Sequence, residues 1–237
     1  MSGLLDRALA DPWTLLDGLL DGPLHPGGHE ATATLLDRAD VTAGTRLLDV
    51  GCGAGDALQL ARERGARAVG VDRNPGTPAS VRADMTALPV ETDGVDVVLA
   101  ECVLCLAPSL AAALAEADRV LARGGRLAIS DVVVETEPPD VPDPIAEALC
   151  LTGRRDETGL VAAIEDAGFE VGTVWDHRAD LLAMRDELAG AVDYEGLLSA
   201  LGERGQLLLE GIETLETAIE DGEVRYVSLV AERHHGI

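Results

Sequence analysis

Arg46-Leu-Leu-Asp-Val-Gly-Cys-Gly-Ala-Gly-Asp56 is the stretch that decides the fold of this chain. An apolar run ends in an acid at Asp49, glycines follow at positions 51, 53 and 55, and a helix-compatible run begins at Ala57. A backbone turns this sharply and approaches a ligand this closely only where no Cβ is in the way. The helix that follows offers unpaired N–H groups to a polar ligand. The stretch therefore predicts a strand, a glycine turn and a helix that form a binding site.

A second acid lies at the distance that such a site needs. Ala68-Val-Gly-Val-Asp72 predicts another buried strand, and an acid about 20 residues past the turn can accept hydrogen bonds from ribose hydroxyls. A dinucleotide fingerprint begun at Gly51 would need glycine at position 56, where this chain has Asp56. A diphosphate gains nothing from a carboxylate there, whereas a cofactor with a sulfonium and an ammonium tolerates one. A dinucleotide-dependent oxidoreductase is therefore the disfavoured alternative.

Several ordered motifs resemble those of the class I S-adenosylmethionine-dependent methyltransferases of small molecules. They are Leu48–Gly55, Val71-Asp72, Ala83-Asp84-Met85, Val95–Cys102 and Arg119–Leu127. The likeness spans roughly residues 40 to 135, which makes it far more specific than one glycine loop. It implies an α/β fold with a Rossmann-like, seven-stranded, mostly parallel sheet and an antiparallel last strand. It also implies an enzyme, a methyltransferase with S-adenosyl-L-methionine as cofactor.

The resemblance assigns cofactor contacts to residues of these motifs. Asp49 and the glycine backbone would meet the methionine half, and Asp72 would hold the ribose hydroxyls. Asp84 would hold the adenine amino group, with Met85 against the ring face. The full set of expected cofactor-binding residues is Asp49, Gly51, Gly53, Gly55, Asp72, Asp84, Met85 and Glu101.

The ends of three predicted strands nominate the catalytic residues. Parallel strands end at one edge of a sheet, which brings Glu101–Cys105, Ser130-Asp131 and Trp175–His177 toward the transferable methyl. Methyl transfer mainly needs an aligned acceptor and exclusion of water, but a neutral acceptor also needs a base. We expect Glu101 or His177 to be that base, with Cys102 beside them. A carboxylate at a strand end is also a common helix cap, which is the alternative interpretation of Glu101. His25, before the first predicted strand, is a further candidate for the site.

Cys102 and Cys150 resemble two metalloid-binding cysteines of arsenite methyltransferases. Thiolates are the soft ligands that trivalent arsenic prefers. The chain departs from that pattern, since Leu58 stands where the family has a further cysteine and Arg154-Arg155 replaces aromatic residues. No bound metal is predicted, because Cys102-x-x-Cys105 lacks a second pair. Metalloid methylation, methylation of another small molecule, and a non-enzymatic cofactor-binding or sensing module stay as alternatives, with a small molecule as the partner in each.

Charge and composition exclude other functions. The 237 residues carry 43 acids against 18 bases, all arginine, for a net charge of −25. Such an acidic surface repels nucleic acid and anionic membranes. No targeting or membrane-spanning segment is visible, and four cysteines in a chain this long fit a reducing compartment, so we expect a cytoplasmic protein. The acid excess predicts a halophilic protein that loses structure on dialysis from molar salt; unchanged stability would contradict this.

The segment order predicts a single methyltransferase domain over 1–237, with N-terminal helices within 1–40 and a helical insert at 178–221. The insert leaves from the carboxyl edge of the sheet, where ligands bind, so we expect a lid; a packing appendage is the alternative. The oligomeric state is left open. Predicted helices are about Leu4–Leu20, Glu30–Arg38, Ser109–Leu121 (stopped by Gly124-Gly125), Glu157–Ala167, Ala179–Val192, Tyr194–Glu203 and Gln206–Glu220. Predicted strands end at Val50, Asp72, Ala83, Ala100, Ser130 and Trp175, a proline-rich loop occupies 138–144, and Val224–Glu232 is the closing strand.

Overall fold

The structure is a computed structural model that describes residues 23–143, 146, 149–151, 155–191, 194–200 and 202–234. A seven-stranded sheet has the order β3-β2-β1-β4-β5-β7-β6. The first five strands pair in parallel, and β6 and β7 pair antiparallel, which confirms the expected Rossmann-like fold. The strands are β1 (Arg46–Val50), β2 (Arg67–Asp72), β3 (Ser80–Arg82), β4 (Val95–Glu101), β5 (Leu121–Val134), β6 (Phe169–Asp176) and β7 (Val224–Arg233). The predicted helix at Leu4–Leu20 lies outside the described residues.

The chain divides into two compact units, which we call the sheet unit and the helical unit. The sheet unit comprises Gly28–Asp131, Thr158–Asp176 and Val227–Ile237. The helical unit comprises Met1–Gly27, Val132–Glu157 and His177–Tyr226.

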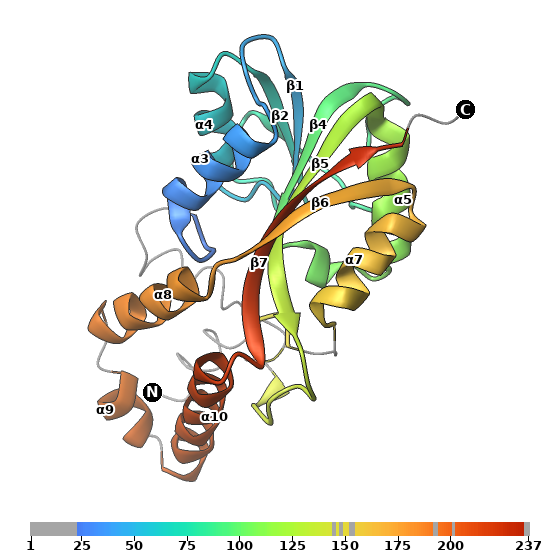
Figure 1. Cartoon of the computed structure of the whole chain (residues 1–237). Coiled ribbons are helices and arrows are strands. Elements are labelled where there is room, and N and C mark those ends of the chain that lie inside the picture. Colours follow the sequence, from blue (N-terminus) through green and yellow to red (C-terminus); the bar gives the residue numbers. More distant parts are fainter. Residues whose placement is uncertain are drawn as a thin grey trace. The chain divides into compact units, whose positions relative to one another are not determined.

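Helices cover both faces of the sheet unit (Figure 1). Figure 1 shows α3 (Gly28–Arg38) and α4 (Asp56–Glu63) on one face, and α5 (Leu110–Val120) and α7 (Glu157–Asp166) on the other. Side chains alternate along β4, so Leu99 joins the core under α3 and α4, while Ala100 lines a small apolar cavity with residues of α5. Because both faces are covered there, the inner strands β1 and β4 are buried at almost every position.

One edge of the sheet lacks the alternation of strand and helix that the sequence predicts. Residues 73–79 and 83–94, all described, connect β2 to β3 and β3 to β4 as loops without a helix. Prolines at positions 75, 78 and 89 explain the difference, since proline removes a helical hydrogen bond. As a result Val69 and Val81 are about half exposed, at 48% and 55%.

The start of β5 also differs from the prediction. The preceding helix α5 ends at Val120, and Gly124-Gly125, predicted to stop it, lie inside β5. The register between β4 and β5 shifts there, because Leu121 pairs with Val95 and Arg126 with Val97. The strand also continues past Ser130 to Val134, since its last three residues are buried valines. A short 3-10 helix, η1 (Leu104–Leu106), follows β4.

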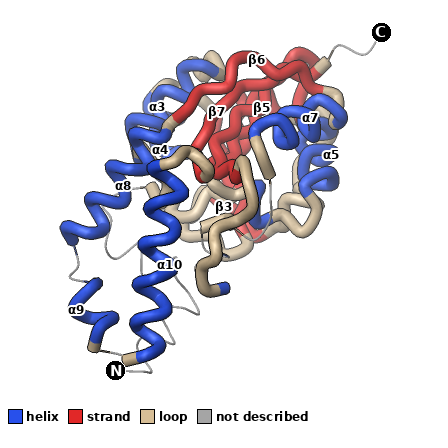
Figure 2. Tube along the Cα trace, turned by 60° about the horizontal axis from the view of Figure 1, so that its bottom comes forward, coloured by secondary structure: helices blue, strands red, loops and turns tan. Residues whose placement is uncertain are grey.

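The helical unit contains the three predicted helical pieces, α8 (Arg178–Ala191), α9 (Tyr194–Ser199) and α10 (Glu203–Glu220), drawn as blue tubes in Figure 2. An ion pair between Arg185 and Glu220 joins α8 to α10, with Nη1 and Oε1 3.0 Å apart. The proline-rich loop packs on α10 at Gly211, where a Cβ would lie 2.6 Å from Pro142. Among the described residues, none of the helices combines the length and hydropathy needed to cross a membrane.

Candidate functional site

The glycine turn after β1 adopts a backbone that side chains would obstruct. Gly51, Gly53 and Gly55 have φ angles of 79°, 47° and 96°. A Cβ on Gly51 would lie 2.4 Å from the Val103 side chain, and one on Gly55 would lie 2.9 Å from Thr77. Gly53 has no atom within 4 Å of that position. The turn is therefore packed at both ends and open in the middle, as a cradle for a ligand requires.

Asp72 holds this turn from the end of β2. Its Oδ2 accepts a hydrogen bond from the Gly53 amide at 3.0 Å, and its Oδ1 accepts one from the Asn74 amide at 2.7 Å. A carboxylate has about four acceptor sites, so each oxygen can still accept a bond from a hydroxyl. Asp72 is therefore positioned against the turn, with acceptor capacity for a ligand.

Asp49 is a buried acid directly before the turn. The residue is only 3% exposed, and its Oδ2 has no hydrogen-bond partner among the described residues. Burial raises the pKa of Asp49 well above its usual value, and the charges of Glu101 and Asp72 raise it further. An unpaired buried carboxyl is costly, so its place beside the turn fits a ligand that carries positive charge, as the sulfonium and ammonium of S-adenosylmethionine do.

Glu101, at the end of β4, is bonded to a helix that the sequence did not connect with it. The Thr32 hydroxyl on α3 donates to Glu101 Oε2 at 3.1 Å and lies 3.3 Å from Oε1. Thr32 is completely buried. Sequence reasoning missed Thr32, because a threonine in a helix 69 residues away carries no local signal.

Asp84 and Met85, expected at the adenine, lie at the loop after β3. Asp84 Oδ1 accepts from the Thr86 amide at 2.9 Å and its hydroxyl at 2.6 Å, and Oδ2 accepts from Arg73 Nη2 at 3.0 Å. These bonds, those of Thr86 first, lower the pKa of Asp84 to about 2. Met85 is buried and lines the small apolar cavity with Val50.

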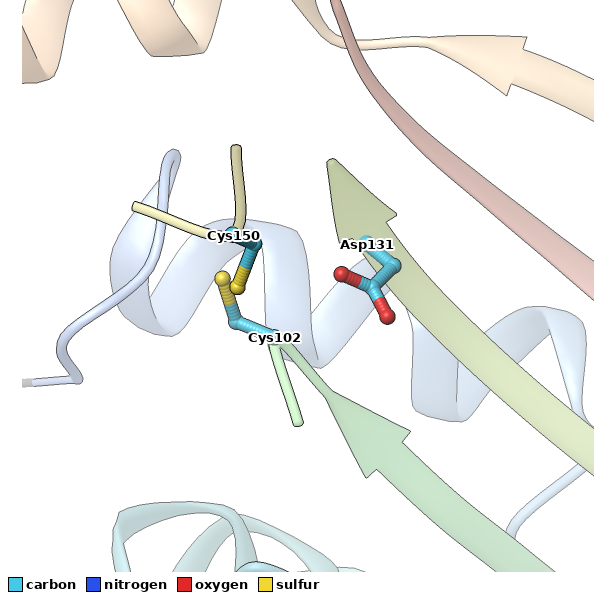
Figure 3. Close-up of side chains that lie close together, drawn as sticks. All are labelled: Cys102, Asp131 and Cys150. Atoms are coloured by element: carbon cyan, nitrogen blue, oxygen red, sulfur yellow. The ribbon is translucent and has the colours of Figure 1, made fainter. Parts of the chain in front are cut away.

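Cys102 and Asp131 approach each other where β4 and β5 pass side by side (Figure 3). A Cys102 Sγ and a carboxylate oxygen of Asp131 lie within 4.8 Å. Cys102 has a positive φ of 54°, rare for a residue with a side chain, and its amide donates to Ser130 O at 2.7 Å. Asp131 is fully buried, and its Oδ2 accepts from the Cys105 amide at 3.1 Å. Cys150, also labelled in Figure 3, belongs to the helical unit. Cys105 and Cys150 are each disulfide-bonded, which the sequence did not predict, whereas Cys102 is a free thiol.

His177 lies in the helical unit against Tyr226. Its Nδ1 is 2.9 Å from Asp180 Oδ2, and its ring meets Tyr226 edge-on, with centroids 6.1 Å apart. His25 stacks on the same tyrosine at 6.5 Å and is 7% exposed. The structure therefore brings His25 and His177 together around Tyr226, which sequence reasoning missed because Tyr226 lies in a strand of apolar pattern.

Comparisons with known proteins identify methyltransferases as relatives of this chain. Residues 48–129 match the family model described as "Methyltransferase domain". The chain is 34% identical over 204 residues to Methyltransferase GfsG of Streptomyces halstedii, which covers 77% of this chain and 73% of that protein. It is also 34% identical over 152 residues to an arsenite methyltransferase of Halobacterium salinarum, which covers 56% of this chain and 39% of that protein.

Solved structures share the fold at lower identity. The [4+2]-cyclase SpnF superposes with a TM-score of 0.73 at 21% identity and covers 98% of this chain and 95% of its own. Geranyl diphosphate C-methyltransferase from Streptomyces coelicolor gives 0.67 at 20% identity, covering 86% and 79%. The fold and the glycine site define a class I Rossmann-like cofactor-binding protein. The chain belongs to the S-adenosylmethionine-dependent methyltransferases, and S-adenosylmethionine is its cofactor.

Proposed function

We propose that this methyltransferase acts on a small-molecule acceptor and holds its cofactor at the carboxyl edge of the sheet unit. The observation that carries the cofactor site is Asp49, whose buried carboxyl lies beside the glycine turn with an oxygen that no described residue satisfies. A buried titratable group that lacks a partner in the free protein often marks a site where a bound ligand supplies that partner.

The residues of the proposed site have separate roles in methyl transfer. The bound cofactor supplies a methyl group already activated on a sulfonium, so the protein has to bind, orient and exclude water. We assign the ribose hydroxyls to Asp72, the adenine amino group to Asp84 and the methionine half to Asp49 and the turn. Glu101 or His177 would take the proton of a neutral acceptor.

Two observations support a small acceptor. The net charge of −25 disfavours phosphate backbones and anionic membranes. Neighbours in fold include enzymes whose names specify geranyl diphosphate and phosphoethanolamine as substrates, each a small molecule.

A turnover assay tests the proposal. Purified protein and S-adenosylmethionine with a labelled methyl group are incubated with trivalent arsenic, thiols, phenols and quinol precursors, under excess thiol. Transfer to any of these supports an enzyme of small molecules. Cofactor binding without transfer to any acceptor favours the non-enzymatic binding or sensing module. If Glu101→Gln and His177→Ala both leave the turnover-versus-pH profile unchanged, the base assignment is wrong.

Metalloid methylation is the second candidate, favoured by the arsenite methyltransferase relative and by the placement of Cys102. In this proposal trivalent arsenic is the substrate, and Cys102 and Cys150 are its soft ligands, once the disulfide that holds Cys150 has been reduced. Cys102→Ser and Cys150→Ser should then each abolish transfer to arsenic while cofactor affinity stays unchanged. If Cys150→Ser hardly changes activity, another acceptor is favoured.

We also propose that residues 178–221 act as a lid. They form helices of the helical unit and connect β6 to β7 from the carboxyl end of β6, and open α/β sheets bind ligands at that edge. Hydrogen exchange of α8 to α10 should then slow when S-adenosylhomocysteine is added. Exchange that is independent of the ligand would leave them as a packing appendage.

A further inference from the structure

The Asp49 carboxyl has an environment unlike that of an ordinary ion-pair partner. It lies within β1, two residues before Gly51, and is 97% buried, since only 3% of the residue is exposed. Its Oδ2 is buried and lacks a hydrogen-bond partner among the described residues. An ionised carboxylate in such a place is strongly destabilising, because it has left water without a compensating charge.

The groups that act on Asp49 are acids or neutral. Glu101 faces it from β4 and Asp72 from β2, the two strands that pair with β1. Cys52 faces it from the turn, and burial, with Asp49 next, raises the pKa of that thiol to about 11. Among the described residues, no arginine is recorded in an ion pair or hydrogen bond with Asp49. Burial and the two neighbouring acids therefore favour the protonated, neutral carboxyl in the cofactor-free protein.

We infer that Asp49 is a charge-sensing residue: it holds a proton in the cofactor-free protein, releases that proton to solvent when S-adenosylmethionine binds, and thereby makes the pocket prefer the sulfonium cofactor over its neutral thioether product. This inference rests on the proposed cofactor site. The carboxylate left by the proton is the counter-charge for the arriving cation, and no oxidant or other reactant is involved.

The product of methyl transfer differs from the cofactor by one positive charge. S-adenosylmethionine carries a sulfonium and an ammonium, whereas S-adenosylhomocysteine keeps only the ammonium. A nearby cation favours the charged form of a carboxyl, so the cofactor should expel more protons than the product. Where one proton is released, affinity rises by up to about tenfold per pH unit. The affinity ratio of cofactor to product should therefore increase with pH.

Proton counting by calorimetry tests this directly. The heat of binding of S-adenosylmethionine and of S-adenosylhomocysteine is measured near neutral pH in two buffers with different heats of ionisation, such as phosphate and Tris. We expect the heat for the cofactor to differ between the buffers by an amount that corresponds to as much as one proton released per site. The heat for the product should differ less.

Two variants identify the group that releases the proton. Asp49→Asn is nearly isosteric with the protonated acid, so it should fold, and its cofactor heat should no longer depend on the buffer. Asp37→Asn, an exposed acid on α3 paired with Arg64, should behave like the wild-type protein. Unfolding temperatures of both variants verify that they fold. If Asp49→Asn does not fold, the number of protons released by the wild-type protein still tests the inference.

Three results would overturn the inference: a buffer-independent heat for the wild-type protein, equal proton release for cofactor and product, or full proton release in Asp49→Asn. In each of these cases the cofactor still binds, so the proposed function stands. Absence of any binding heat or of any protection by the cofactor against unfolding would instead contradict the proposed cofactor site.

Discussion

Acidic side chains at the two edges of the parallel sheet differ in burial and in hydrogen-bond partners. At the amino edge, Asp96 at the start of β4 receives two side-chain hydrogen bonds from Arg46, at 2.6 and 3.1 Å. At the carboxyl edge, Asp49 is deeper and yet has an oxygen without a partner among the described residues. A paired acid near solvent supports the fold, whereas an unpaired buried acid opposes it. This difference is what we expect if the carboxyl edge binds the cofactor, because a bound cation would stabilise a carboxyl that destabilises the free protein.

The largest effect is expected for Asp72→Ala at the carboxyl edge. The variant removes the acceptor of the Gly53 amide and the proposed partner of the ribose hydroxyls. A hydrogen bond to a charged group contributes roughly 1.5–3 kcal/mol, so cofactor affinity should fall about tenfold to a hundredfold. Calorimetry measures the change, with Glu63→Ala, an exposed residue at the end of α4, as a control that keeps its affinity. Equal affinity in Asp72→Ala and the control would remove Asp72 from the site.

The next effect concerns stability and pH at Asp49. Its pKa in the folded protein is raised above the unfolded value near 4, so folding favours the proton. The stabilisation associated with that proton is complete below the unfolded pKa and is lost as pH rises toward the folded pKa, at up to about 1.4 kcal/mol per pH unit. Asp49→Asn cannot lose a proton, so its stability relative to wild type should increase with pH. Denaturant unfolding at several pH values measures this; a constant difference would contradict it.

A smaller effect is expected from the amino edge. Arg46→Met leaves Asp96 without its two-pronged partner, and both side chains are 42% exposed. Solvent screens such a pair, so the variant should be destabilised by only about 0.5–1.5 kcal/mol, and by less in molar salt. Cofactor affinity should not change, because the pair lies at the opposite edge from the glycine turn. Loss of cofactor affinity in Arg46→Met would break the distinction between the two edges.

The same contrast explains what the sequence can and cannot predict. The glycine turn and Asp72 are local signals, since a tight backbone demands glycine and an acid at a strand end follows the strand pattern. The contact between Thr32 and Glu101 is not local and depends on how α3 packs, which a pattern of helix-forming residues does not specify. The end of α5 was predicted to within one residue, but the start of β5 was not, because pairing of Leu121 with Val95 includes Gly124-Gly125 in the strand.

The smallest effect is expected at Thr32, a residue that the sequence did not predict to be part of the site. Thr32→Val keeps the shape of this buried side chain but removes the hydroxyl that donates to Glu101. If Glu101 is the base, turnover should fall about twofold to tenfold and its pH profile should move to higher pH, because the carboxylate has lost a donor that favours its charged form. Cofactor-free stability should change by less than about 1 kcal/mol, since valine fills the same space.

Thr34→Val is the matched control for that variant. Thr34 lies on the same helix, but its hydroxyl donates to the Glu30 backbone carbonyl at 2.9 Å and is exposed to solvent. Its removal should leave both turnover and the pH profile unchanged, whereas Thr32→Ser, which keeps a hydroxyl, should restore the wild-type profile. If Thr32→Val and Thr34→Val have the same turnover-versus-pH profile, the Thr32 side chain contributes only packing, and the position of Glu101 depends on β4 alone. A shift seen only in Thr32→Val would instead make α3 part of the carboxyl edge, because a purely structural role would change stability without moving the pH dependence.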